Sequence, residues 1–252
     1  MLGTIKSERH WQWAAYGKHP SARDYFKVGQ NFPLLNVFSD WIEKGYQVLA
    51  AKNIPAQRVC FWRFWTREAR RQNIICGVVR DSNDGIGRPY PLLIIGSGPL
   101  KGWEKLWDLI PFACEKTWRQ IEYLSTQMFD DFKKLEAEVQ NIRPPYAEWS
   151  EFIKKREDFV EVNSPGLREL ENRASSLSEK AECFICLDQG PFHDQFEMIS
   201  LWHFLFKSRD KTVPNSIFMG GTVEKAYIAF FKRPLMSSDF IKLWSVSTEL
   251  IL

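Results

Sequence analysis

Residues 73–79 read NIICGVV and residues 91–95 read PLLII, two continuous apolar runs of strand length. A third run, VCFWRFW at residues 59–65, is rich in aromatic residues. Continuous apolar runs are typical of strands that are buried on both faces, beneath helices on each side of a sheet. We therefore predict three strands at Val59–Trp65, Asn73–Val79 and Pro91–Ile95, in a sheet that helices cover on both sides.

The residues before these runs predict one strand and one long helix. The aromatic run Trp11–Tyr16 favours a strand. After Pro33, apolar residues recur at helical spacing, and Asn53 with Pro55 is typical of the end of a helix. The apolar stripe of this helix comprises Leu34, Phe38, Trp41, Ile42, Gly45 and Leu49.

The residues after these runs alternate between helical and strand patterns. Residues 101–141 predict a helix that Pro111 bends or divides, since proline removes a backbone hydrogen bond. The charged residues 146–182 predict short surface helices and loops. The remaining predicted elements are strands at Glu182–Leu187, Ser216–Met219 and Ala226–Phe231, a helix around Phe196–Phe206, and a last helix at Ser237–Trp244 with Ser238 as its N-cap.

The mixed order of these elements predicts an α/β fold, a layered α/β/α sandwich whose mixed sheet is covered by helices. We expect residues 1–252 to form a single domain. Residues 1–140 and 182–252 both supply buried-type strands, so we expect them to complete one core. Residues 146–182 are expected to be peripheral.

Composition excludes some classes of function. The chain has 34 basic and 31 acidic residues, a net charge of +3, which argues against a dedicated nucleic-acid-binding protein. Residues 1–100 carry a net charge of +7 and residues 101–252 a net charge of −4. Aromatic residues make up 15% of the chain, and such residues favour cores and interfaces. A basic front half could face an acidic partner, although a solvated surface is the favoured interpretation.

The expected compartment is the cytoplasm. No apolar run reaches the roughly 18–20 residues that span a bilayer, and residues 1–13 lack the apolar core of a signal peptide. We therefore expect no membrane insertion and five free cysteines. The Cys183-Phe-Ile-Cys186 spacing lies in an apolar run and lacks a second pair of zinc ligands, which favours core packing. The sequence predicts no cofactor or metal, and it does not indicate an oligomeric state.

No familiar catalytic motif is present. The four histidines are His10, His19, His193 and His203, and none belongs to a known catalytic spacing. An arginine cluster interleaves with aromatic residues in a way that resembles a nucleic-acid or acidic-protein surface. A strand whose arginines line one edge is the favoured interpretation. The cluster comprises Arg58, Arg63, Arg67, Arg70 and Arg71.

Two polar loops are more informative. Residues 16–26 read YGKHPSARDYF and residues 80–91 read RDSNDGIGRPYP. Each combines serine, aspartate and arginine with turn-forming residues, so the side chains can form ion pairs and cap backbone groups. They either fix the loops or line one face used for recognition, and we expect Asp24 to approach Arg88. The candidate residues are Lys18, Ser21, Arg23, Asp24, Ser82, Asp84 and Arg88.

These loops resemble the signature segments of the TagF family, accessory proteins of bacterial type VI secretion systems. The family pattern Y-G-K-x-P-S-x-x-D-F is similar to residues 16–26, and P-S-x-D-x-x-G-R-x-F-P-L is similar to residues 81–92. The Trp62-Arg63-Phe64 segment also resembles the family. The sequence departs from the pattern at Asp81, at Ala22-Arg23 and at Pro89. The resemblance is specific over about residues 14–95, within the TagF-like N-terminal region 1–140.

The resemblance implies an α/β sandwich and no enzymatic activity. It implies post-translational repression of type VI secretion, by binding a cytoplasmic forkhead-associated scaffold protein. An alternative is a small-molecule or nucleotide-binding enzyme that uses the Asp/Arg loops as its site. A basic, water-filled pocket at Arg88 would favour the enzyme, and an exposed apolar-aromatic patch beside it would favour protein binding.

Overall fold

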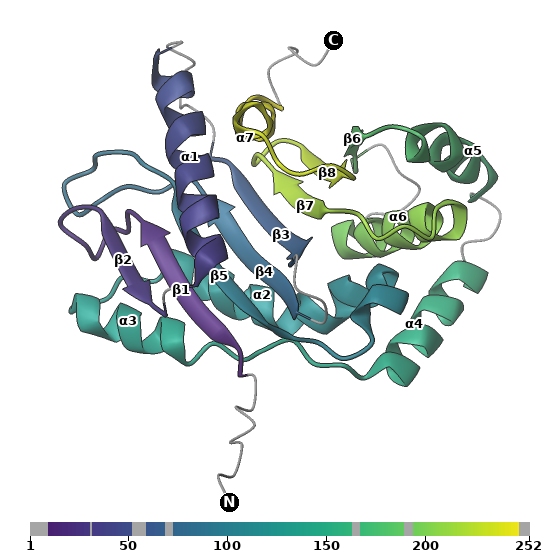
Figure 1. Cartoon of the computed structure of the whole chain (residues 1–252), viewed down its shortest axis with the longest axis horizontal. Coiled ribbons are helices and arrows are strands. Elements are labelled where there is room, and N and C mark those ends of the chain that lie inside the picture. The colour runs from purple at the N-terminus through teal and green to yellow at the C-terminus, as the bar shows by residue number, and fades with distance from the viewer. Residues whose placement is uncertain are drawn as a thin grey trace, which may run out of the picture.

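The computed structural model describes residues 10–30, 32–51, 59–68, 73–162, 167–188 and 194–246, with backbone alone at 159–162. Within these residues, eight strands form one sheet at the centre of the molecule (Figure 1). The strands are β1 (Gln12–Gly17), β2 (Phe26–Gly29), β3 (Phe61–Arg67), β4 (Asn73–Arg80), β5 (Leu92–Pro99), β6 (Glu182–Cys186), β7 (Ser216–Gly221) and β8 (Ala226–Phe231). Their order across the sheet is β2-β1-β5-β4-β3-β7-β8-β6.

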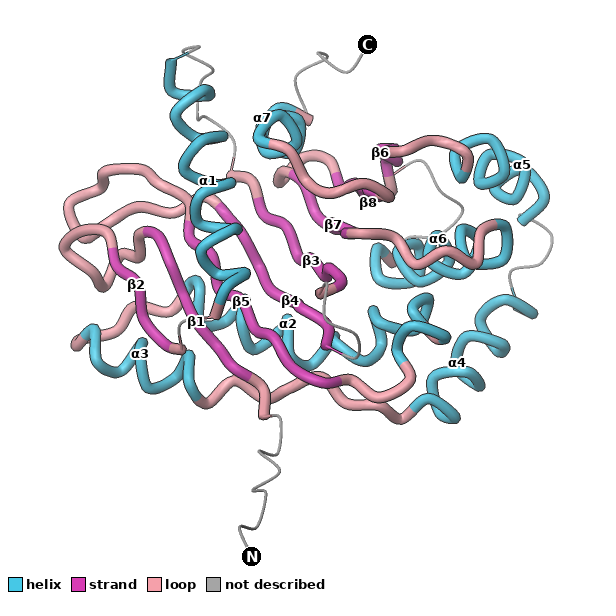
Figure 2. The backbone as a smooth tube through the Cα atoms, in the orientation of Figure 1, coloured by secondary structure: helices cyan, strands magenta, loops and turns pink. Residues whose placement is uncertain are grey.

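Helices cover both faces of this sheet, so the α/β sandwich expected from the sequence is confirmed (Figure 2). The helices are α1 (Pro33–Ala51), α2 (Ile110–Thr126), α3 (Phe132–Gln140), α4 (Trp149–Val162), α5 (Leu167–Ser178), α6 (Gln195–Arg209) and α7 (Ser237–Ser245). Two 3-10 turns, η1 (Trp103–Lys105) and η2 (Trp107–Leu109), precede α2.

The sheet is antiparallel in every described pair, and the expectation of a mixed sheet was wrong. The apolar runs predict that the strands are buried on both faces, but they do not predict whether neighbouring strands are parallel or antiparallel. Here two helix layers bury an antiparallel sheet as completely as they would a parallel one. The hairpin pairs β3–β4 and β7–β8 supply much of this pairing.

Side chains of β3 alternate between the two helix layers, as strand geometry requires. Trp62 and Phe64 are buried in the core beneath α1 and α7, while Trp65 is buried in the larger core beneath α2, α3 and α6. Helices α1 and α7 pack closely because Gly45 has no side chain. A Cβ atom at Gly45 would lie 2.5 Å from the Phe240 ring.

Strand β3 also pairs with β7, so the two ends of the chain share one sheet. Helices α4 and α5 lie on the same side of the molecule, with α6 between them in this view (Figure 1). Phe152 and Leu170 from these helices are buried in the larger core. That the whole chain behaves as a single domain, with residues 146–182 peripheral to it, stays a prediction.

Three local expectations differ from the structure. Pro111 does not bend a helix; it lies in the first turn of α2, where a missing N–H costs nothing, and the chain leaves the helix after Thr126 instead. Ser238 is not the N-cap of α7, since Met236 holds that position and its N–H donates to the Asp239 carboxylate. Strand β2 was not expected at all.

Asp194 is the N-cap of α6, where its carboxylate accepts the N–H of Phe196. All five cysteines are free. Among the described helices, none combines the length and the apolar character needed to cross a membrane.

Candidate functional site

The two polar loops lie side by side at one end of the sheet (left in Figures 1 and 2). They meet because β1 and β5 are paired, with Gly17 opposite Leu92. Gly17 has φ +120°, and a Cβ atom there would lie 2.0 Å from the Pro91 carbonyl oxygen, so only glycine fits. A backbone hydrogen bond of 2.8 Å from Gly85 to Ala22 joins the loops further out.

Asp84 organises the contact between the loops. Its carboxylate is buried and accepts the N–H groups of Ile86 and Arg88 at 3.2 and 2.9 Å. Its Oδ2 atom accepts Arg88 Nε at 2.7 Å and pairs with Lys18 Nζ at 3.0 Å. Lys18 is buried too, and it donates to the Arg88 carbonyl at 3.4 Å. The Lys18–Asp84 pair therefore ties the first loop to the second from inside.

The electrostatics of Asp84 follow from these contacts. Burial favours the neutral acid, but the hydrogen bonds from Arg88, Lys18 and Ile86 outweigh it and hold the pKa of Asp84 below its ordinary value. Asp84 is therefore an ionised carboxylate that uses its oxygens to accept hydrogen bonds from within the two loops.

A second anchor joins the first loop to the end of α2. His19 is fully buried, and its Nδ1 accepts the Ser21 N–H at 3.1 Å, so the proton lies on Nε2, which donates to the Leu124 carbonyl at 3.3 Å. The Ser21 hydroxyl accepts the Phe129 N–H at 2.7 Å. In the other loop, the Ser82 carbonyl accepts the Tyr90 N–H at 3.0 Å. These contacts stabilise the two loops, and they involve Ser21, Ser82 and His19, the last of which was not among the predicted residues.

Three of the seven predicted residues face outward instead. Arg23, Asp24 and Arg88 are exposed. Arg88 approaches Asp24 at 3.4 Å, as expected, and its guanidinium also donates to the Arg23 carbonyl at 3.1 Å. An exposed ion pair of this kind stabilises a fold little, because water and salt screen it. Arg88 is also held from inside by Asp84, while Arg23 and Asp24 face solvent, where a partner can reach them.

Two apolar side chains complete this outward face. Ile86 is 74% exposed and Tyr25 is 54% exposed. We call the face formed by Arg23, Asp24, Tyr25, Ile86 and Arg88 the loop surface. The sequence interpretation did not name Tyr25 or Ile86 as candidates, although together they provide an exposed apolar-aromatic patch of the kind that would favour protein binding.

Tyr25 is held in place by a cluster of tyrosines. Its ring meets the edge of Tyr90 at a centroid distance of 4.6 Å, and Tyr46 meets Tyr90 at 4.9 Å. The hydroxyls of Tyr16 and Tyr90 are 3.1 Å apart, and Lys18 Nζ lies 4.5 Å from the centre of the Tyr25 ring. These residues come from three parts of the chain, so local spacing gave no signal of the cluster.

The arginine cluster does not form one free surface. Arg63 lies under α2, where its guanidinium donates to Glu115 at 2.8 Å and to Glu122. Arg67 is exposed and donates to the Asn215 side chain at 3.4 Å. Arg58, Arg70 and Arg71 lie outside the described residues.

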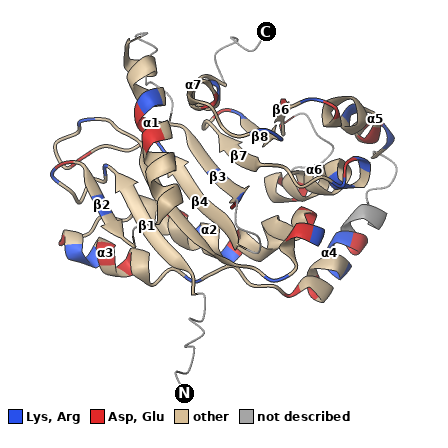
Figure 3. Ribbon diagram, in the orientation of Figure 1, with Lys and Arg blue, Asp and Glu red and all other residues tan. Residues whose placement is uncertain are grey.

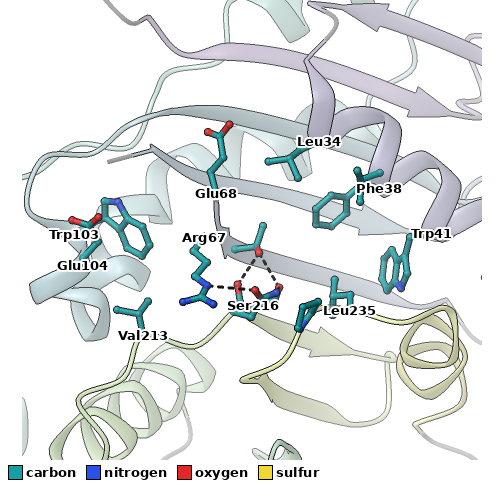
Figure 4. Close-up of a pocket in the computed structure, with 14 residues that line it drawn as sticks. Leu34, Phe38, Trp41, Arg67, Glu68, Trp103, Glu104, Val213, Ser216 and Leu235 are labelled. Carbon is teal, nitrogen blue, oxygen red and sulfur yellow. Dashed lines mark hydrogen bonds between the residues drawn. The ribbon is translucent and has the colours of Figure 1, made fainter. Parts of the chain in front are cut away.

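A separate cavity of about 710 Å³ lies between the start of α1, the end of β3 and the start of β7 (Figure 4). Leu34, Phe38 and Trp41 form an apolar wall, and Arg67 and Ser216 lie opposite them (Figure 4). Its size and lining suit a largely apolar ligand. It is lined by none of the loop-surface residues, so it does not make the loops a ligand pocket.

His203 on α6 is a buried titratable group away from the loops. Its Nε2 accepts the Trp65 indole N–H at 3.1 Å, so Nδ1 carries the proton and donates to the Ile199 carbonyl at 2.7 Å. Burial lowers the pKa of His203 from 6.5 to about 4. Burial lowers the pKa of His19 as well. His193 lies outside the described residues.

We expect the protein to lose stability as pH falls below about 6.5. The unfolded chain binds a proton at His203 below that pH, whereas the folded chain keeps the ring neutral down to about pH 4. The contribution of neutral His203 to the free energy of unfolding is complete above pH 6.5. It is lost progressively as the pH falls toward 4, by about 3 kcal/mol in all. Urea denaturation between pH 7.5 and 4.5 (~0.5-unit steps) measures it. His203→Gln is expected to flatten the pH dependence, and an unchanged slope in that variant would contradict the assignment.

The comparisons with known proteins place the chain in a family. Residues 14–143 match the family described as TagF N-terminal domain, type VI secretion system-associated. The crystal structure of PA0076 from Pseudomonas aeruginosa PAO1 has a similar fold, with a TM-score of 0.55 and 14% sequence identity, over 95% of this chain and 97% of that chain. No curated protein matches the sequence.

Proposed function

Because this chain belongs to the TagF family of type VI secretion system-associated proteins, we propose that it is a post-translational repressor of type VI secretion. It acts by binding a cytoplasmic forkhead-associated scaffold protein through the loop surface. The observation that carries this proposal is the loop surface itself, which joins exposed apolar side chains to charged ones on a buried framework.

The side chains of the loop surface suit a protein interface. Tyrosine and arginine are enriched at such interfaces and often contribute most of the binding energy. Tyr25 is oriented by Tyr90 and Lys18, so it loses little conformational freedom on binding. The buried Lys18–Asp84 pair fixes both loops before a partner arrives.

The charges of the loop surface suit an acidic partner. Arg23 and Arg88 are exposed beside a single exposed carboxylate, that of Asp24. Attraction between opposite charges speeds association and is screened by salt, so binding should be faster at low ionic strength. Repression then needs only that the protein bind the unassembled scaffold more tightly than the assembled one, which shifts the population toward the unassembled state.

The enzyme alternative has less support from the loops. The buried ends of Lys18 and Asp84 neutralise each other, and Asp84 already accepts four hydrogen-bond or ion-pair contacts from Arg88, Ile86 and Lys18. Little of their charge is left for a substrate.

The test is genetic and biochemical. Deletion of the gene should raise type VI secretion, and a pull-down with the tagged protein should capture the forkhead-associated scaffold. Complementation with the wild-type gene is the control, and it should restore the lower level. An unchanged level of secretion on deletion, with no scaffold in the pull-down, would refute the repressor role and favour the small-molecule alternative.

A further inference from the structure

A second cavity, of about 490 Å³, lies where the turns before α2 meet α4 and α6, at the other end of the molecule from the loop surface (Figure 1). Figure 3 shows cationic and acidic positions of α4 and α6 on this same side. Four cationic side chains from three parts of the chain line the cavity: Lys105, Arg156, Lys207 and Lys211. Two carboxylates, Glu104 and Asp108, also line it, so its lining carries a net charge of +2.

Asp108 positions two of these cations. It is 1% exposed, and its two oxygens pair with Arg156 Nη1 at 2.6 Å and Lys207 Nζ at 2.5 Å. One buried carboxylate therefore holds two cations from α4 and α6 side by side. The guanidinium carbon of Arg156 also lies 5.4 Å from the centre of the Phe204 ring, a cation–π contact that adds to its positioning.

Several donors of these cations remain unused. Lys207 has three N–H groups and Arg156 has five, and Asp108 takes only one from each. Arg156 Nη2 has only a distant contact with Glu157, at 4.0 Å. Within the described part of the chain, the ammonium groups of Lys105 and Lys211 make no ion pair or hydrogen bond.

Helix polarity alone does not account for this cluster. Cations in the last turn of a helix interact favourably with its dipole, which explains Lys207 and its neighbour Arg209 in α6. Lys105 lies in η1 and Arg156 in α4, however, so the dipole of α6 did not select them. Their convergence on one cavity needs a different reason.

We propose that this cavity binds a small molecule that carries a diphosphate group. A cavity of 490 Å³ is within the usual size range of small-molecule sites, roughly 300–1,000 Å³. Arginine and lysine together are the usual ligands of phosphate oxygens, arginine through its planar fork and lysine through a point charge. A ligand with two or more negative charges would balance the net charge of +2 on the cavity lining. Phe204 provides an apolar contact for the part of the ligand beyond the diphosphate.

Titration calorimetry with inorganic pyrophosphate and with ADP tests the proposal and distinguishes a bare diphosphate from a nucleoside diphosphate. At least one probe should bind, more weakly as salt is raised. Lys105→Glu and Lys211→Glu should each weaken binding about tenfold or more, since each removes a charge-assisted contact. Lys101→Glu and Arg209→Glu make the same charge reversals at residues that are close to Lys105 and Lys211 in sequence but do not line the cavity, and they should leave the affinity within about twofold.

Citrate, an anion of similar charge without phosphorus, should bind at least tenfold more weakly than the better diphosphate. The proposal is overturned if neither diphosphate binds, if the control variants lose as much affinity as the cavity variants, or if citrate binds as tightly. Thermal melts of every variant establish that each is folded, so a loss of binding reports on the cavity.

Discussion

Replacing Arg63 by glutamate is expected to lower the free energy of unfolding by about 3–5 kcal/mol. The Arg63 side chain is only 19% exposed, and its guanidinium binds Glu115 and Glu122 of α2 at once. Burial alone would lower the pKa of Arg63, but the two carboxylates reverse this and raise it, a sign that they stabilise the charge. Glutamate in its place would put three carboxylates together beneath a helix.

Arg67→Glu is the matched control, because it reverses the same charge four residues further along the same strand. Arg67 is exposed, and its side-chain hydrogen bond to Asn215 is long at 3.4 Å, so a change within about 1 kcal/mol is expected. Urea denaturation followed by tryptophan fluorescence and by circular dichroism measures both variants. An equal loss of unfolding free energy in the two variants would show that the contacts of Arg63 with Glu115 and Glu122 do not stabilise the fold. Separate transitions in the wild type would refute the single domain.

Much of the fold could be predicted because burial leaves a local trace in the sequence. The runs at residues 73–79 and 91–95 became β4 and β5, and the helical stripe after Pro33 became α1. Strand direction left no such trace. Nor did β2, Phe26–Gly29, which has a single buried residue, Val28, and depends on its pairing with β1.

The candidate site was predicted in part for the same reason. Turn chemistry marked both loops, and Asp24 does approach Arg88. The buried partner of Asp84 is Lys18, however, at a sequence separation that no local pattern encodes. Arg63 was grouped with the other arginines of this stretch because the sequence shows few acidic residues near it, while Glu115 and Glu122 reach it from a distant helix.

The second large effect is expected at the loop surface. Ile86→Asp and Tyr25→Ala should each weaken scaffold binding by about thirtyfold or more, because each removes a central apolar contact, and the aspartate adds an unpaired charge. Both side chains are largely exposed, so the fold should be unaffected. Val223→Asp and Tyr123→Ala are matched controls, at exposed residues 87% and 62% accessible that lie outside the loop surface.

The affinity of the purified forkhead-associated scaffold for these four variants and the wild type tests the central claim most directly. Biolayer interferometry at low and at physiological salt supplies both the equilibrium constant and the association rate. The account predicts that wild type, Val223→Asp and Tyr123→Ala bind alike, that Ile86→Asp and Tyr25→Ala bind at least thirtyfold more weakly, and that association slows as salt rises. Tight binding by Ile86→Asp and Tyr25→Ala, or no binding by the wild type, would contradict it.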